Sequence, residues 1–292
     1  MGPDGRLGTA RGRLMHDLLT EPFALGFMRR ALIGCLALSV AAPPLGVFLV
    51  LRRMSLMSDV MQHGVLPGIA LGAAVAGMSV WAMGLGGVAA GLAVALLAGW
   101  LARGKGARED SQLAGVYLIA LALGVALISA QRGIDLTHVL FGSVLAVDDT
   151  ALFAMAGVVT IALPVLALIW RPLILESLDP GFLAATGGKG GLWHLIFLAL
   201  VVLCVVAGFV ALGTLMSVGL MMLPAIASRH WSDSLQGQVR ASVLIAVLAS
   251  VAGLLLSYHT DIPAGPAIVL TAGALWMVGL LVSSRPWRGS GG

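Results

Sequence analysis

The sequence predicts an all-α integral membrane protein with about eight or nine transmembrane helices. Of its 292 residues, 59% are hydrophobic and 10% are charged, and the mean hydropathy is +1.02, whereas a soluble chain is about half apolar and a quarter charged. The apolar residues form runs of the helical length, roughly 20 residues, that crosses a hydrocarbon core of about 30 Å. They lack the alternating pattern of a membrane β-barrel, so helices must satisfy the backbone within lipid. Eight or nine crossings use nearly the whole chain, so no room is left for a separate catalytic domain.

Polar residues divide the apolar sequence into nine candidate spans, at residues 31–51, 56–78, 79–101, 113–130, 151–170, 193–211, 213–228, 239–256 and 264–283. The segment 134–147 is apolar but short, which favours a re-entrant or interfacial helix over a full crossing. Asp148 and Asp149 precede the fifth span and are predicted N-caps. Residues 1–22 form a basic polar leader without the apolar core of a signal peptide. One transmembrane domain is predicted over residues 23–284, followed by a short tail at 285–292.

The basic residues lie mostly in short connections between apolar runs, although the net charge is +4 and the pI about 9.7. That placement is typical of topology signals and argues against a nucleic-acid partner. If residues 52–55 face the cytoplasm, eleven of the seventeen basic residues lie on that side: Arg52, Arg53, Arg103, Lys105, Arg108, Arg171, Lys189, Arg229, Arg240, Arg285 and Arg288. Small residues recur at helical spacing in two rows, Gly68, Gly72 and Ala76, and Gly87, Gly91 and Ala95. These rows are predicted to be faces where helix backbones approach closely.

Asp59 and His63 are the candidate metal ligands. They are four residues apart within a predicted span, so a helix places them on the same face. Counted from Arg53 at 1.5 Å per residue, they lie roughly 9 to 15 Å into the membrane. Ionisable groups at such depth are costly and by default mark a pathway. Carboxylate and imidazole together suit zinc, manganese or iron, and two ligands alone would release the ion again. The alternative is an Asp to His hydrogen bond that only neutralises both groups.

Three stretches resemble the permease subunits of bacterial zinc and manganese ABC importers, the ABC-3 family. They are GVFLVLRRMSLMSDVMQHGVLPGIALG at 46–72, HVLFGSVLAVD at 138–148 and GTLMSVGLMMLPAIASR at 213–229, and the match continues in order over most of 23–283. The resemblance implies that Asp59 and His63 contact the transported metal. It also implies a homodimer in the bacterial inner membrane, a cytoplasmic ABC ATPase and a periplasmic or extracellular metal-binding protein as partners, and alternating access as the mechanism.

The connection at 176–187, ESLDPGFLAATG, is the second candidate site. Asp179 suits an N-cap, Pro180 the first helical position and Gly187 the C-terminus, so a short surface helix is predicted. The resemblance implies that this is the coupling helix that docks on the ATPase, with Asp179, Phe182, Ala184 and Gly187 as contact residues. The family more often has acidic residues at positions 180 and 181. A merely interfacial connecting helix is the alternative.

The sequence argues for a transport subunit and against an enzyme, because it contains no catalytic constellation. A nucleotide-binding loop needs G-x-x-x-x-G-K-[ST], but around Lys189 the chain has Leu183 for the first glycine and Gly190 for the hydroxyl residue. ATP hydrolysis therefore requires a separate subunit. No permanently bound cofactor is predicted, only a transported divalent metal, with zinc preferred over manganese or iron. The rival functions are a permease for a metal chelate of the siderophore type and a gradient-driven cation transporter.

Overall fold

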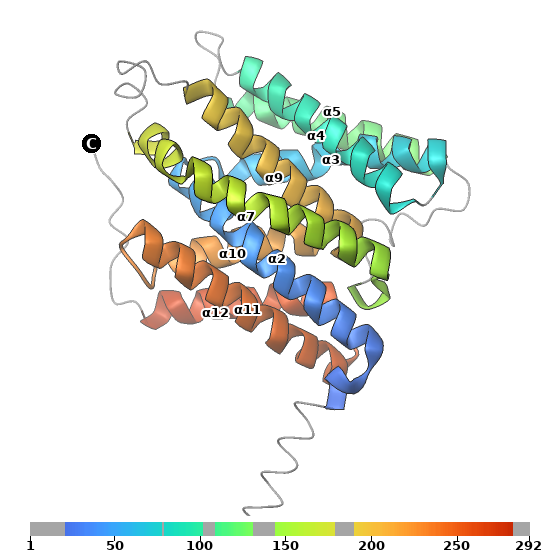
Figure 1. Ribbon diagram of the computed structural model, residues 1–292, viewed down its shortest axis with the longest axis vertical. Helices are drawn as coiled ribbons and strands as arrows, with labels where there is room; N and C mark the ends of the chain where they lie inside the picture. The colour runs from blue at the N-terminus through green and yellow to red at the C-terminus, as the bar shows by residue number, and fades with distance from the viewer. Residues whose placement is uncertain (1–20, 78, 102–108, 131–143, 179–189, 283–292) are drawn as a thin grey trace, which may run out of the picture.

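The computed structural model describes residues 21–77, 79–101, 109–130, 144–178 and 190–282, and these residues form an all-α protein (Figure 1). The elements in chain order are α2 (Gly26–Leu51), α3 (Ser55–Ala76), α4 (Val80–Leu101), α5 (Glu109–Ala130), the short 3-10 helix η1 (Val144–Ala146), α7 (Asp149–Leu178), α9 (Gly190–Leu212), α10 (Thr214–Ser228), α11 (Leu235–Thr260) and α12 (Ala264–Val282). Each of the nine predicted spans overlaps one of these α-helices. The predicted fold class is confirmed.

Six helices in the described part of the chain are long and apolar enough to cross a membrane: α2, α4, α7, α9, α11 and α12. Shorter apolar stretches occur in α5 and α10, at Gly115–Ala130 and Thr214–Ser228. Large apolar side chains cover the outer surface, as at Ile119, Phe153 and Leu168, which are 72%, 75% and 79% exposed. Such a surface is unfavourable in water and normal in lipid. The chain is therefore a multi-pass membrane protein.

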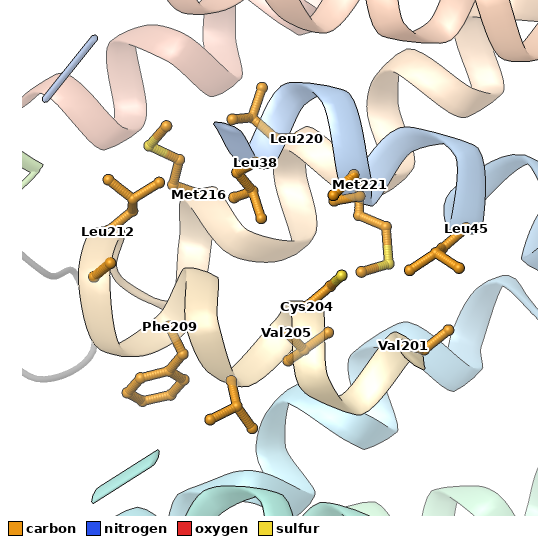
Figure 2. Close-up of a cluster of buried hydrophobic side chains, with 14 of the residues drawn as sticks. Leu38, Leu45, Val201, Cys204, Val205, Phe209, Leu212, Met216, Leu220 and Met221 are labelled. Atoms are coloured by element: carbon orange, nitrogen blue, oxygen red, sulfur yellow. The ribbon is translucent and has the colours of Figure 1, made fainter. Parts of the chain in front are cut away.

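The helices form two groups joined by α9. Helices α3, α4 and α5 pack together on one side, and α2, α10, α11 and α12 pack together on the other. Helix α9 contacts members of both groups and also α7 (Figure 1). Figure 2 shows the buried apolar cluster where α2, α9 and α10 meet, with Leu38, Leu45, Val201, Val205, Phe209, Met216 and Met221 among its residues. Helix α3 packs against α2, α9 and α10, so this central cluster supports its position.

The glycines of both predicted rows lie in close helix contacts. A Cβ atom at Gly68 would overlap the carbonyl oxygen of Gly86, and one at Gly72 would overlap that of Ala82, so α3 and α4 pack backbone against backbone. In the second row, Gly91 faces Val65 of α3 and Val202 of α9. Glycine permits such approach because it has no side chain beyond the backbone. The close α3–α4 contact fixes the helix that carries the candidate ligands.

Helix α7 is longer than the sequence predicts. The predicted span ends at residue 170, before Arg171 and Pro172, but the helix continues to Leu178. Tertiary contacts support the additional turns, since Leu173 is fully buried and Glu176 pairs with Arg52 of the α2 C-terminus at 3.0 Å. At the other end of α7, Asp148 is confirmed as a cap: its Oδ1 accepts a hydrogen bond from the Ala151 amide at 2.8 Å.

Candidate functional site

A tight turn between α2 and α3 sets the direction of the helix that carries Asp59 and His63. The Met54 amide donates to the Leu49 carbonyl at 2.8 Å, and the Arg53 amide donates to the Val50 carbonyl at 3.2 Å. Arg53 has φ 58°, in the left-handed region. Together these features form a Schellman motif, which satisfies the last carbonyls of α2. Because α3 begins at Ser55, immediately after this turn, both candidate ligands lie within its first three turns, close to a fixed point.

The face of α3 that carries Asp59 points away from the chain's own core. Asp59 is exposed, whereas its neighbours Ser58 and Val60 are buried at 1% and 4% exposure. His63, one turn later on the same face, is half-buried. The predicted pairing of the two residues on one helical face is therefore present in the fold.

The His63 ring lies against Tyr117 of α5, a residue that the sequence reasoning did not single out. The two ring centroids are 4.9 Å apart and the rings are inclined at 81°, an edge-to-face arrangement. The Nδ1 atom of His63 is buried and has no hydrogen-bond partner among the described residues. Nδ1 therefore makes no hydrogen bond to Asp59. Leaving a buried polar atom without a partner costs about 1–3 kcal/mol, which is a cost that a bound ligand would remove.

If Asp59 and His63 bind a transported metal, as the sequence predicts, replacing Tyr117 by alanine is expected to lower the initial rate of metal uptake roughly 2- to 10-fold, because an edge-to-face aromatic contact contributes about 0.5–1.5 kcal/mol. Tyr117→Phe keeps the ring contact and is expected to retain most of the rate. The matched control is Tyr258→Ala, which changes the chain's other tyrosine, an exposed residue of α11. Uptake by Tyr117→Ala at the wild-type rate would contradict a role for this ring in orienting His63.

One copy of the described chain offers two candidate ligands and no complete coordination shell. The described residues contain no group of three or more His, Cys, Asp or Glu side chains placed to hold a metal ion. Asp59 and His63 supply one carboxylate and one imidazole, the donor types that first-row divalent metals accept. Such a pair can hold an ion briefly and can be supplemented by water or by a second protein surface.

The residues of the predicted coupling helix, Asp179, Phe182, Ala184 and Gly187, lie outside the described residues, as do residues 134–143 of the short apolar segment. The described chain does include both flanks of the coupling segment, since α7 ends at Leu178 and α9 begins at Gly190. Beside these flanks lies Arg52, which the sequence analysis treated only as a topology signal. Its side chain is 8% exposed. Only an indirect sequence signal indicated buried partners for Arg52: Glu176 and His194 lie near the predicted cytoplasmic ends of two other spans.

Comparisons with known proteins agree with this architecture. The model of the ABC 3 transport family matches residues 24–283. The chain is 32% identical over 260 residues to the manganese import system permease protein ScaB of Streptococcus parasanguinis, covering 89% of this chain and 91% of that protein. It is 29% identical over 272 residues to the chelated iron transport system membrane protein YfeD of Yersinia pestis, covering 92% and 89%.

A solved structure is also similar in three dimensions. PsaBC from Streptococcus pneumoniae, in complex with Fab, superposes with a TM-score of 0.82 at 29% identity, over 92% of this chain and 96% of that one. The family match spans nearly the whole described region. The chain belongs to the ABC 3 transport family and is a multi-pass membrane permease.

Proposed function

We propose that this chain is the permease of an ATP-driven importer of divalent metal, with manganese or ferrous iron as cargo and with Asp59 and His63 as the transit site. The manganese and iron relatives described above support these cargoes. The sequence-based preference for zinc rests on the same two ligands, which also accept zinc. Zinc is therefore the second candidate, to be decided by uptake measurements.

The exposure of Asp59 is the observation that carries this proposal. A carboxylate turned outward from a helix within a membrane protein is very costly if it meets lipid, so it must face a water-filled path or another protein surface. Intramembrane acids that meet such paths typically mark ion routes. The adjacent imidazole of His63 adds a second donor on the same helical face.

A second copy of the chain is the surface that we propose opposite Asp59. In a symmetric dimer the same patch lies on both subunits, so two carboxylates and two imidazoles would line one path on the axis. Each copy contributes only the pair within its described residues. Sharing the site between copies would let small movements of the two α3 helices change the number of ligands, which is how an ion is first held and then released.

The proposed partners supply the energy and the cargo. The chain has no nucleotide-binding loop, so the proposal requires a cytoplasmic ATPase subunit. Asp179, Phe182, Ala184 and Gly187 are proposed to contact it. A periplasmic or extracellular binding protein is proposed to deliver the metal on the opposite face, and alternating access then exposes the α3 site to one side at a time.

The test is metal uptake into vesicles that contain the permease with its ATPase, together with the binding protein. We expect uptake of Mn²⁺ or Fe²⁺ to require ATP hydrolysis by the ATPase subunit and to be faster than uptake of Zn²⁺. Faster uptake of Zn²⁺ would favour the second candidate. Metal movement driven by an ion gradient without nucleotide would contradict the importer. Uptake of a metal chelate that is unaffected by Asp59→Ala would contradict the transit site and favour a chelate permease.

A further inference from the structure

A buried cluster centred on Arg52 joins the ends of three helices. The Arg52 side chain is 8% exposed, and its Nη2 donates to Glu176 Oε2 at 3.0 Å. Its Nε donates to Ser177 Oγ at 2.9 Å, and its Nη1 lies 2.8 Å from His194 Nδ1. A longer contact of 3.5 Å runs from Nη2 to the Leu173 carbonyl. Arg52 follows the last residue of α2, Glu176 and Ser177 lie in the last turn of α7, and His194 lies near the start of α9.

The chemistry of these contacts makes the cluster specific for arginine. A guanidinium group only donates hydrogen bonds, so His194 Nδ1 must accept and the ring is the neutral form with its proton on Nε2. All three guanidinium nitrogens are therefore used, each toward a different side chain. The planar fork of arginine permits this arrangement, and the single ammonium of lysine does not reproduce it.

Aromatic side chains pack against the guanidinium group and between the three helices. The Arg52 Cζ atom lies 5.0 Å from the centroid of the Phe197 ring, a cation–π contact. Phe48, one turn before Arg52 on α2, packs edge-on against Trp170 of α7 with centroids 5.1 Å apart and against Phe197 of α9 with centroids 6.2 Å apart. The polar cluster and these aromatic side chains thus connect the same three helices.

The cluster lies close in sequence both to the proposed ATPase contact and to the helix that carries the proposed metal site. Its partners Ser177 and His194 lie two residues before and five residues after residues 179–189, the connection that contains the proposed ATPase contact. Arg52 itself lies at the start of the rigid turn from which α3 begins, seven residues before Asp59. A buried charge cannot readily leave its partner, because an unpaired buried ion is strongly disfavoured. Displacement of the α7 and α9 ends is therefore transmitted to Arg52.

We propose that Arg52 is a positioning residue that couples movement at the α7 and α9 ends to the helix carrying Asp59 and His63. This inference rests on the proposed function. The buried cluster moves as a unit, and the Schellman turn passes the movement to α3. When the cluster is removed, the ATPase still turns over, but its cycle no longer reorients the metal site.

The test compares Arg52→Gln, Arg52→Lys and the double variant Arg52→Gln/Glu176→Gln in the complete transporter in vesicles. The double variant leaves no unpaired charge in the cluster, so it is the variant least prone to misfold. The readouts are the amount of assembled complex, the rate of ATP hydrolysis and the amount of Mn²⁺, Fe²⁺ or Zn²⁺ moved per ATP. Arg171→Gln is the matched control, because Arg171 is an exposed arginine on the same helix as Glu176.

We expect Arg52→Gln and the double variant, where they assemble, to hydrolyse ATP while moving at least about 5-fold less metal per ATP, the lower end of typical coupling between two sites. Arg52→Lys should be intermediate, and Arg171→Gln should match wild type. If the assembled double variant or Arg52→Lys moves as much metal per ATP as wild type, the proposed role of Arg52 is overturned, while the proposed function stands. A loss of assembly in every variant would also overturn this role, because it would show that the cluster is purely structural. A wild-type complex that moves none of the three metals would instead overturn the proposed function, and this inference with it.

Discussion

Substituting Asp59 by alanine is expected to reduce the initial rate of metal uptake by at least about 100-fold, because residues that merely support metal ligands already change affinity or activity about 10- to 100-fold. His63→Ala is expected to have a similar effect, since each substitution removes one of the two proposed ligands, and the described residues contain no larger group of candidate ligands. Assembly should be unchanged, because Asp59 is exposed and His63 is only half-buried, and substitutions outside the core usually change stability little. The measurement is ATP-dependent uptake per assembled complex.

Two matched variants control for the loss of an acid or an imidazole as such. Asp149→Ala removes a carboxylate that is 71% exposed and pairs with Arg30 at 3.6 Å. His230→Ala removes a half-buried imidazole just after α10. Both are expected to transport at the wild-type rate. If the double variant Asp59→Ala/His63→Ala assembles and still accumulates Mn²⁺, Fe²⁺ and Zn²⁺ normally, these residues do not form the transit site.

Replacing Gly68 by alanine is expected to destabilise the permease by about 3 kcal/mol or more, at the upper end of what overpacking costs. The new Cβ would overlap the Gly86 carbonyl oxygen and lie 2.6 Å from the Ala90 Cβ. These atoms belong to the backbone of α4 or are attached directly to it, so no flexible side chain can move aside. Helices α3 and α4 must separate, and the expected result is a lower melting temperature in detergent and little assembled complex.

Gly84→Ala is the control for this prediction, since Gly84 lies on α4 and a Cβ there meets nothing within 4 Å. This variant should keep or slightly raise the melting temperature, because alanine is favoured over glycine in a helix by up to about 1 kcal/mol. A melting temperature for Gly68→Ala equal to that of wild type would contradict the backbone-to-backbone contact between α3 and α4.

Much of the architecture and the central pair could be predicted because the responsible signals are local. Apolar runs of membrane length predict the helices, and a spacing of four residues is enough to place Asp59 and His63 on one face. The small-residue rows predict close packing at Gly68 and Gly72, which the fold contains. The end of α7 was predicted eight residues too early, because Arg171 and Pro172 resemble a boundary and the contacts of Glu176 that extend the helix come from a distant part of the chain.

By itself, the sequence determined that the chain crosses a membrane many times and that one of its helices carries an acid and an imidazole in register. Only the tertiary structure decided that Asp59 is exposed, that Tyr117 lies against the His63 ring and that Arg52 is buried rather than solvated. The physical reason is separation along the chain: Arg52 meets Ser177 and His194 across 125 and 142 residues. Helical periodicity specifies which side chains share a face, whereas the packing of distant helices specifies what that face meets.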